Sequence, residues 1–152
     1  MKTIPLTQGR VALVEDEDYE WLSQWNWFAK KSGKTFYAER SEKLPDGRWA
    51  TFRMNRQILG LKHGDKRQGD HINHDTLDNR RANLRIVTKQ QNMWNQKKSR
   101  RGFAWNKRAK KWYAYIGVNG QKIHLGVFEK PEEARRAYLK AKAIYHQIGK
   151  VA

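Results

Sequence analysis

Residues 70–92 read DHINHDTLDNRRANLRIVTKQQN, and the fold of the middle of the chain follows from this stretch. Short apolar runs stand on each side of a polar loop, so Gly69 to Ile72 and Leu84 to Val87 are expected to pair as two strands. Thr88, followed three residues later by Gln91, has the pattern of a capping box and predicts the start of a helix. The stretch therefore predicts a strand, a loop, a strand and a helix.

This order of elements brings one carboxylate and one amide oxygen beside a histidine. Asn92 is expected near the first turn of the helix, on a face that looks back at Asp70. Hard divalent cations such as Mg²⁺ or Mn²⁺ prefer these oxygen ligands, and they stabilise the charge that develops when a phosphodiester is hydrolysed. An imidazole with a pKa of about 6.5, here that of His71, can take a proton from the attacking water. His74 is a rival base or third ligand, although a loop residue without a role is the preferred interpretation.

One feature of the strand works against this arrangement. Adjacent residues on a strand point to opposite faces, so His71 and Asp70 can act together only with local distortion or with a metal that approaches from the loop edge.

The set Asp70-His71, Asn83-Leu84-Arg85 and Asn92 resembles the signature of HNH homing-type endonucleases of the phage branch, which have a ββα-metal fold. The resemblance implies that His71 is the general base and that Asp70 and Asn92 are metal ligands. It also implies that Asn83 fixes the loop and orients His71, and that Arg85 contacts the scissile phosphate.

The resemblance extends over residues 1–96, including the upstream segments 5–9 and 18–22. Many relatives have His-Arg where this chain has Asn55-Arg56, so no auxiliary role is carried over to that position.

The N-terminal part is expected to be rich in β structure. Residues 10–14 and two segments near 35–40 and 48–54 have the composition of strands, and the last two flank the turn 45–47. The acidic run 15–20 is expected to open a short helix and to face solvent, because acids complement a helix N-terminus. A second short helix is expected over residues 55–61.

The last third predicts three antiparallel strands over residues 103–107, 112–118 and 121–128, with an Asn119-Gly120 hairpin turn. Pro131 and the acids after it predict a helix start, and apolar residues at helical spacing reach Ile148, with Gly149 as the stop. We therefore expect a three-stranded sheet with one helix across it.

This C-terminal pattern is similar to the Apetala/ethylene-response-factor DNA-binding domain, which lays a three-stranded sheet into the major groove. Basic and aromatic residues alternate on its strands, so one sheet face can contact phosphates and bases. Trp112 could lie on either face, because packing on the helix is its alternative. The DNA-binding residues expected here are Arg101, Trp105, Lys107, Arg108, Lys111, Trp112 and Lys122.

Composition limits the partners of the chain. Its 152 residues include 32 Lys and Arg against 15 Asp and Glu, which gives a net charge of +17. A chain this basic favours nucleic acid, and anionic membranes are the weaker alternative because no basic helix with an aliphatic face is found. The absence of cysteine excludes disulfides and thiolate zinc sites. No signal-peptide or transmembrane run is found, so the chain is expected to work in the cytoplasm on DNA.

Together these features predict an α+β protein of two modules, since a hydrophobic fraction of 38% makes one large core doubtful. The nuclease module is expected over residues 1–96, with a β-rich part over 1–61 and a ββα-metal core over about 66–96. A basic linker over 97–101 and a DNA-binding domain over 102–152 follow.

The expected activity is metal-dependent nicking of double-stranded DNA, and the sequence leaves open whether the protein is a monomer or a homodimer. The alternatives are a DNA-binding regulator with a decayed nuclease site and an RNA-directed protein. The major-groove sheet disfavours the second, because that groove is too deep and narrow in A-form RNA.

Overall fold

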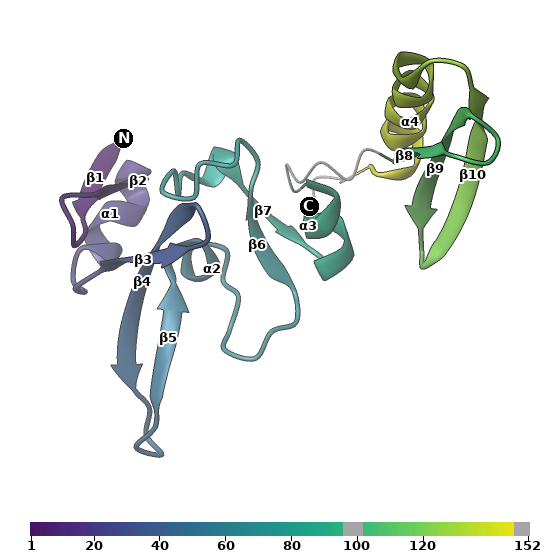
Figure 1. The fold of residues 1–152 in the computed structure, drawn as a ribbon. Helices are drawn as coiled ribbons and strands as arrows, with labels where there is room; N and C mark the ends of the chain where they lie inside the picture. The colour runs from purple at the N-terminus through teal and green to yellow at the C-terminus, as the bar shows by residue number, and fades with distance from the viewer. Residues whose placement is uncertain (96–101, 148–152) are drawn as a thin grey trace. The chain divides into compact units, whose positions relative to one another are not determined.

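A computed structural model of the chain describes residues 1–95 and 102–147 (Figure 1). These residues form a mixed α/β structure with several small antiparallel sheets and four α-helices. They divide into two compact units, one ending at Met93 and the other beginning at Trp94. The expected linker 97–101, including Arg101, and the expected helix stop at Ile148 and Gly149 lie outside the described residues. No described helix is both long enough and apolar enough to cross a membrane.

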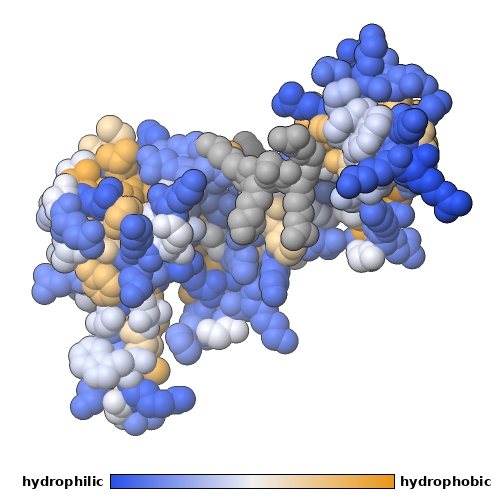
Figure 2. Space-filling model, in the orientation of Figure 1, coloured by the Kyte–Doolittle hydropathy of each residue, from blue (hydrophilic) through white to orange (hydrophobic). Residues whose placement is uncertain are grey.

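The N-terminal unit opens with a two-stranded sheet and a helix. Strand β1 (Lys2–Pro5) pairs with β2 (Val11–Val14), and helix α1 (Asp16–Leu22) follows. Strand β2 and helix α1 were expected from the sequence, whereas β1 was not. Figure 2 shows apolar side chains gathered over these first elements, whereas hydrophilic side chains cover most of the rest of the visible face. The core beneath them includes Ile4, Leu6, Ala12, Val14, Leu22, Trp27, Ala29, Ala38, Met54, Ile58 and Leu84.

One acidic residue of α1 does not face solvent, although the whole acidic run 15–20 was expected to do so. Asp18 is only 1% exposed, and it accepts hydrogen bonds from the guanidinium of Arg81 at 2.6 and 2.8 Å and from the Trp21 indole at 3.1 Å. A buried carboxylate needs such charged partners, because burial without them is costly. Asp16 and Glu17 face solvent as expected.

A second sheet has the order β3 (Phe28–Ser32), β4 (Thr35–Lys43) and β5 (Trp49–Arg53), and the short helix α2 (Met54–Ile58) follows it. Cross-strand partners lie on one face, and successive residues alternate between faces. The register therefore puts buried Ala29 and Ala38 on the core face. The opposite face carries polar side chains, namely Lys30, Tyr37, Glu39 and Arg53.

The predicted strand–loop–strand–helix segment follows. Strand β6 (Gln68–His71) pairs antiparallel with β7 (Leu84–Val87), and helix α3 (Lys89–Asn95) comes directly after them. The 3₁₀ helix η1 (Arg81–Asn83) ends the loop between the strands.

The C-terminal unit contains β8 (Phe103–Asn106), β9 (Lys111–Val118) and β10 (Gln121–Phe128) in one antiparallel sheet, with helix α4 (Pro131–Tyr145) against it. Asn119 and Gly120 both have positive φ, 50° and 79°, as a tight hairpin between twisted strands requires. Pro131 lies in the first turn of α4, as predicted.

Gly102 packs closely against helix α4 of this unit. Its φ is +59°, and a Cβ at this position would lie 1.9 Å from a ring carbon of Tyr138 on α4. Its carbonyl also accepts a hydrogen bond from the Tyr115 amide at 2.7 Å.

Candidate active site

Asp70 and Arg85 are direct partners across strands β6 and β7. The Arg85 guanidinium donates from Nε and Nη2 to Asp70 Oδ2, at 2.8 and 2.7 Å. Asp70 is 7% exposed, and a carboxylate so buried is stabilised by a charged donor. Arg85, which was expected to contact a phosphate, therefore holds the expected metal ligand in this structure.

Asn92 lies in the first turn of α3, as predicted. The capping box before it is confirmed, because the Thr88 amide donates to Gln91 Oε1 at 2.9 Å and the Gln91 amide donates to Thr88 Oγ1 at 3.2 Å. Asn92 Nδ2 donates to Gln68 Oε1 at 2.7 Å. Gln68 and Asp70 are two residues apart on β6 and share one of its faces. The structure thus brings Asn92 to the face that carries Asp70.

His71 is 4% exposed and, as expected for the next residue on the strand, lies on the other face of β6. Its Nε2 lies 3.2 Å from Asn79 Oδ1. Because an amide oxygen can only accept, Nε2 carries the proton and Nδ1 carries the basic lone pair. The Tyr37 ring contacts the imidazole edge to face, with 6.1 Å between ring centroids.

The pKa of His71 is lowered below its usual value of 6.5, mainly because burial disfavours the imidazolium. The hydrogen bond to Asn79 and the charges of Asp70, Asp75 and Asp78 act in the opposite direction but do not outweigh burial. His71 is therefore neutral at pH 7, which is the state that a general base requires.

Asn83 fixes the loop that encloses His71. Its Oδ1 accepts from the Asn73 amide at 3.0 Å, and its Nδ2 donates to the Asp78 carbonyl at 2.8 Å. The resemblance implied that Asn83 also orients His71, but the side chain that accepts the hydrogen bond from His71 Nε2 is that of Asn79. Sequence reasoning missed Asn79 because it is one of several polar residues in the loop and no spacing distinguishes it.

Further contacts brace the same loop. Asp78 pairs with Arg80 at 2.7 Å and accepts from Asn73 Nδ2 at 3.1 Å. These bonds, that of Arg80 first, hold the pKa of Asp78 below its usual value of 3.8. His74, the rival base, has a φ of 69° and donates its amide to the His71 carbonyl at 3.1 Å.

The loop is also tied to the N-terminal sheets. The Leu13 amide donates to the Leu77 carbonyl and the Asn79 amide donates to the Leu13 carbonyl, both at 2.8 Å. Thr76 Oγ1 donates to the Phe36 carbonyl of β4 at 2.6 Å. Strand β2 therefore positions Asn79, the partner of His71, from more than sixty residues upstream in the sequence.

The donor set fits a hard divalent cation. Asp70 supplies a carboxylate, and Asn92, whose Nδ2 is already donated, supplies Oδ1 as a neutral ligand atom. Among residues 1–95 and 102–147, no group of three or more His, Cys, Asp or Glu side chains could hold a metal ion. A set with one carboxylate and one amide leaves several coordination positions for water and phosphate oxygens.

The C-terminal sheet has one face against α4 and one outer face. Buried Ala114 and Ile116 alternate with Tyr113 and Tyr115, so the two tyrosines lie on the outer face. There their rings stack at 5.8 Å, and the ammonium of Lys122 lies 3.8 Å from the Tyr115 ring centroid. Sequence reasoning missed the two tyrosines and His124, although the alternation with small apolar residues could have identified them.

Trp112, for which either face of the sheet was expected, lies on the helix side. It has the parity of Ala114 and Ile116, and it lines a concavity with the α4 residues Arg135 and Tyr138, so it packs on the helix side. Trp105 stands opposite Trp112 with 5.4 Å between ring centroids, and it also borders a shallow outer concavity with Lys107, Arg108 and His124. Lys111 is exposed and pairs with Glu129 at 2.8 Å.

A comparison with protein families identifies one relationship. The family model described as HNH endonuclease matches residues 61–94, which include Asp70, His71, Asn83 and Asn92. None of the curated proteins and none of the solved structures matches the chain. The match supports an HNH nuclease module in this segment, with DNA as the substrate that such a module implies.

Proposed function

We propose that this protein is a metal-dependent HNH endonuclease that hydrolyses one strand of double-stranded DNA. One observation carries the proposal. Asp70 and Asn92 are brought to one face of β6, and the next strand residue, His71, is buried on the other face and bonded to Asn79, in the segment that matches the HNH model. Strands β6 and β7 with helix α3 would then form the ββα-metal core.

His71 would act as the general base. Its Nε2–H is engaged by Asn79, so Nδ1 receives the proton of the attacking water. Asn83 keeps the loop closed around the imidazole, which prevents the ring from turning. A divalent cation, Mg²⁺ or Mn²⁺, held by Asp70 and Asn92 would stabilise the charge that develops on the phosphate and on the leaving oxygen.

Arg85 would have two successive partners. In the absence of DNA it neutralises Asp70, and both of its contacts at 2.7 and 2.8 Å are to Oδ2. A guanidinium binds phosphate as well as carboxylate, so a bound DNA strand offers it a second anion nearby. This arrangement supports the expected contact between Arg85 and the scissile phosphate.

The C-terminal unit would hold the duplex. Its outer face and hairpin turn carry exposed cations, Lys107, Arg108 and Lys122, beside aromatic rings. We propose that this unit is a DNA-binding domain of the Apetala/ethylene-response-factor type and that the protein is a phage-type homing nuclease acting in the cytoplasm. A chain with one such site cuts one strand per visit, so the monomer would nick.

The test is nicking of supercoiled plasmid at low salt with Mg²⁺ or Mn²⁺. His71→Ala should lower the nicking rate by about 10²- to 10⁴-fold, the usual contribution of a general base. Binding of duplex DNA measured in EDTA should be unchanged. His74→Ala is the matched control and should nick at the wild-type rate.

Two results would contradict the proposal. Loss of nicking in His74→Ala but not in His71→Ala would move the base to the other histidine of the loop. A wild-type protein that binds DNA but never cuts it with either metal would be a DNA-binding regulator with a decayed site.

A further inference from the structure

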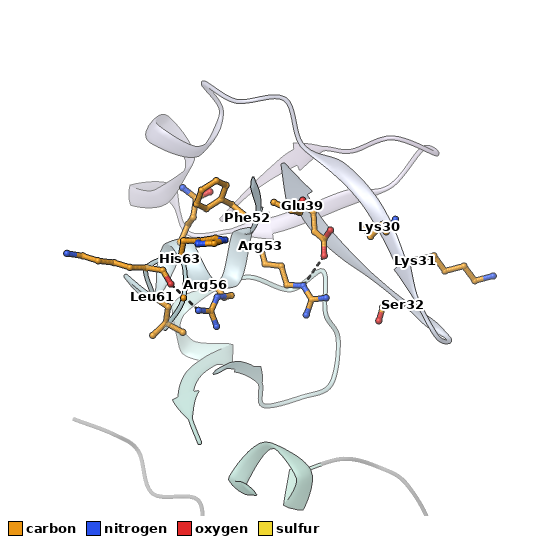
Figure 3. A pocket seen from close by; sticks show the side chains of 13 residues that line it. Lys30, Lys31, Ser32, Glu39, Phe52, Arg53, Arg56, Leu61 and His63 are labelled. Carbon is orange, nitrogen blue, oxygen red and sulfur yellow. Dashed lines mark hydrogen bonds and ion pairs between the residues drawn. The ribbon is translucent and has the colours of Figure 1, made fainter. Parts of the chain in front are cut away.

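An open cavity of about 580 Å³ lies in the N-terminal unit, outside the site described above. Figure 3 shows it between the polar face of the β3–β4–β5 sheet and the segment that contains α2 and the loop after it. Phe52 and Leu61 supply its apolar part. We call it the sheet cleft.

Positive charge dominates the sheet cleft. Its lining contains five Lys and Arg side chains and one acid, Glu39, which pairs with Arg53 at 2.9 Å. Arg56 donates to the backbone carbonyls of Lys62, Asp65 and Arg67, so it shapes the loop while it keeps a positive charge in the cleft. The cations of the lining are Lys30, Lys31, Arg53, Arg56 and Lys62, and His63 lies beside them.

Contacts join the sheet cleft to the candidate active site. The Arg53 guanidinium lies 4.2 Å from the ring centroid of Tyr37, and the same ring contacts the His71 imidazole with 6.1 Å between ring centroids. Asn55 of α2 donates to the carbonyl of Gly69, the residue before Asp70, at 3.0 Å. One aromatic ring thus separates a cation of the cleft from the expected general base.

The chemistry of the cleft favours a polyanion over a small ligand. Small-molecule sites are mostly apolar and enclose most of their ligand, whereas this cleft is open and lined by exposed lysines. A DNA strand carries a negative charge for about every 3.4 Å of helix axis. A strand with one phosphate at His71 would therefore place its neighbouring phosphates within reach of Arg53 and of Lys30, the cross-strand partner of Tyr37.

We propose that the sheet cleft is a second phosphate-binding site, which holds the backbone of the cleaved DNA strand within a few nucleotides of the cut. This inference rests on the proposed function, because it takes DNA as the substrate. The cleft sets the position of the strand, and its contacts are to phosphates, so they carry no base preference.

The experiment compares two double variants of the full chain, each of which removes two exposed lysines from the N-terminal unit. Lys30→Gln with Lys62→Gln changes the cleft, and Lys34→Gln with Lys43→Gln is the control outside its lining. Binding of a random duplex is measured in EDTA over a range of salt concentrations. The slope of log affinity against log salt should decrease in magnitude by about 2 in the cleft variant, about 1 for each phosphate contact, and should stay unchanged in the control.

A slope that is unchanged in the cleft variant, or that falls equally in both variants, would overturn the assignment. Thermal melting of both double variants checks that they fold. If the cleft variant does not fold, Lys31→Gln with Lys62→Gln replaces it in the same measurement. Nicking by the wild type is measured separately with Mg²⁺. Failure of the proposed function would show as absent nicking, whereas a wrong assignment of the cleft would show in the salt slope.

Discussion

The candidate active site and the outer face of the C-terminal sheet differ in the burial of their polar side chains. At the site, Asp70, His71 and Asn83 are all buried, and each is held by a partner before any substrate arrives. On the outer face, Lys122 is exposed, and its ammonium lies over the rings of Tyr113 and Tyr115. Hydrolysis needs groups fixed in one geometry, whereas attachment to a polyanion needs charge that can reach it.

The largest effect is expected at the buried site, where substitution of Asn79 should change the nicking rate. Asn79→Ala removes the acceptor that fixes the proton on Nε2 of His71, so it should lower the single-turnover nicking rate by about 10- to 100-fold, as the loss of orienting partners generally does. Asn79→Asp keeps an oxygen acceptor and should recover part of the rate. Equal rates in Asn79→Ala and wild type would show that the imidazole needs no fixed partner.

A smaller effect is expected on the exposed face. Lys122→Gln should lower the salt slope of duplex binding by about 1 and should leave the melting temperature unchanged, because the ammonium is at the surface. Lys140→Gln, an exposed position on α4, is the matched control and should keep the wild-type slope. A loss of stability in Lys122→Gln without a change in slope would make the stack on Tyr115 a structural contact.

The smallest expected effect is on stability at acidic pH, through the carboxylate of Asp78. The pKa of Asp78 is held below 3.8 by Arg80, so the ionised carboxylate stabilises the folded loop at any pH above that value. This contribution is lost as the pH falls below 3.8 and through the lowered pKa of the folded state. Between pH 5 and pH 3 the urea midpoint should therefore fall more in wild type than in Asp78→Asn. Parallel curves would show that the pair is not coupled to folding.

Local signals in the sequence were sufficient for several elements. The Thr88–Gln91 capping box, the Asn119-Gly120 turn and Pro131 each impose a backbone geometry by themselves, and the structure has that geometry at all three places. Helix and strand periodicity also predicted that Asn92 lies on the side of β6 that carries Asp70.

Other features depend on long-range packing and could not be predicted from local signals. Asp18 is buried because Arg81, more than sixty residues later, lies against it, and Asn79 reaches His71 because β2 holds its backbone. Strand β1 is four residues long and contains Pro5, so it has almost no strand signal without its partner. Trp112 could be expected on either face because basic residues surround it, although its alternation with Ala114 and Ile116 indicates the helix side.

Gly102 is expected to tolerate almost no substitution, although glycine has no side chain. Every amino-acid change at a glycine codon adds at least a Cβ, and here that atom would collide with the Tyr138 ring on a backbone of positive φ. In a saturation library selected for DNA binding, position 102 should therefore be as depleted of variants as a core position, even though the residue has no side chain to lose. Tyr138→Ala would remove the collision but not the strain of the positive φ, so changes at position 138 should restore Gly102 variants only in part.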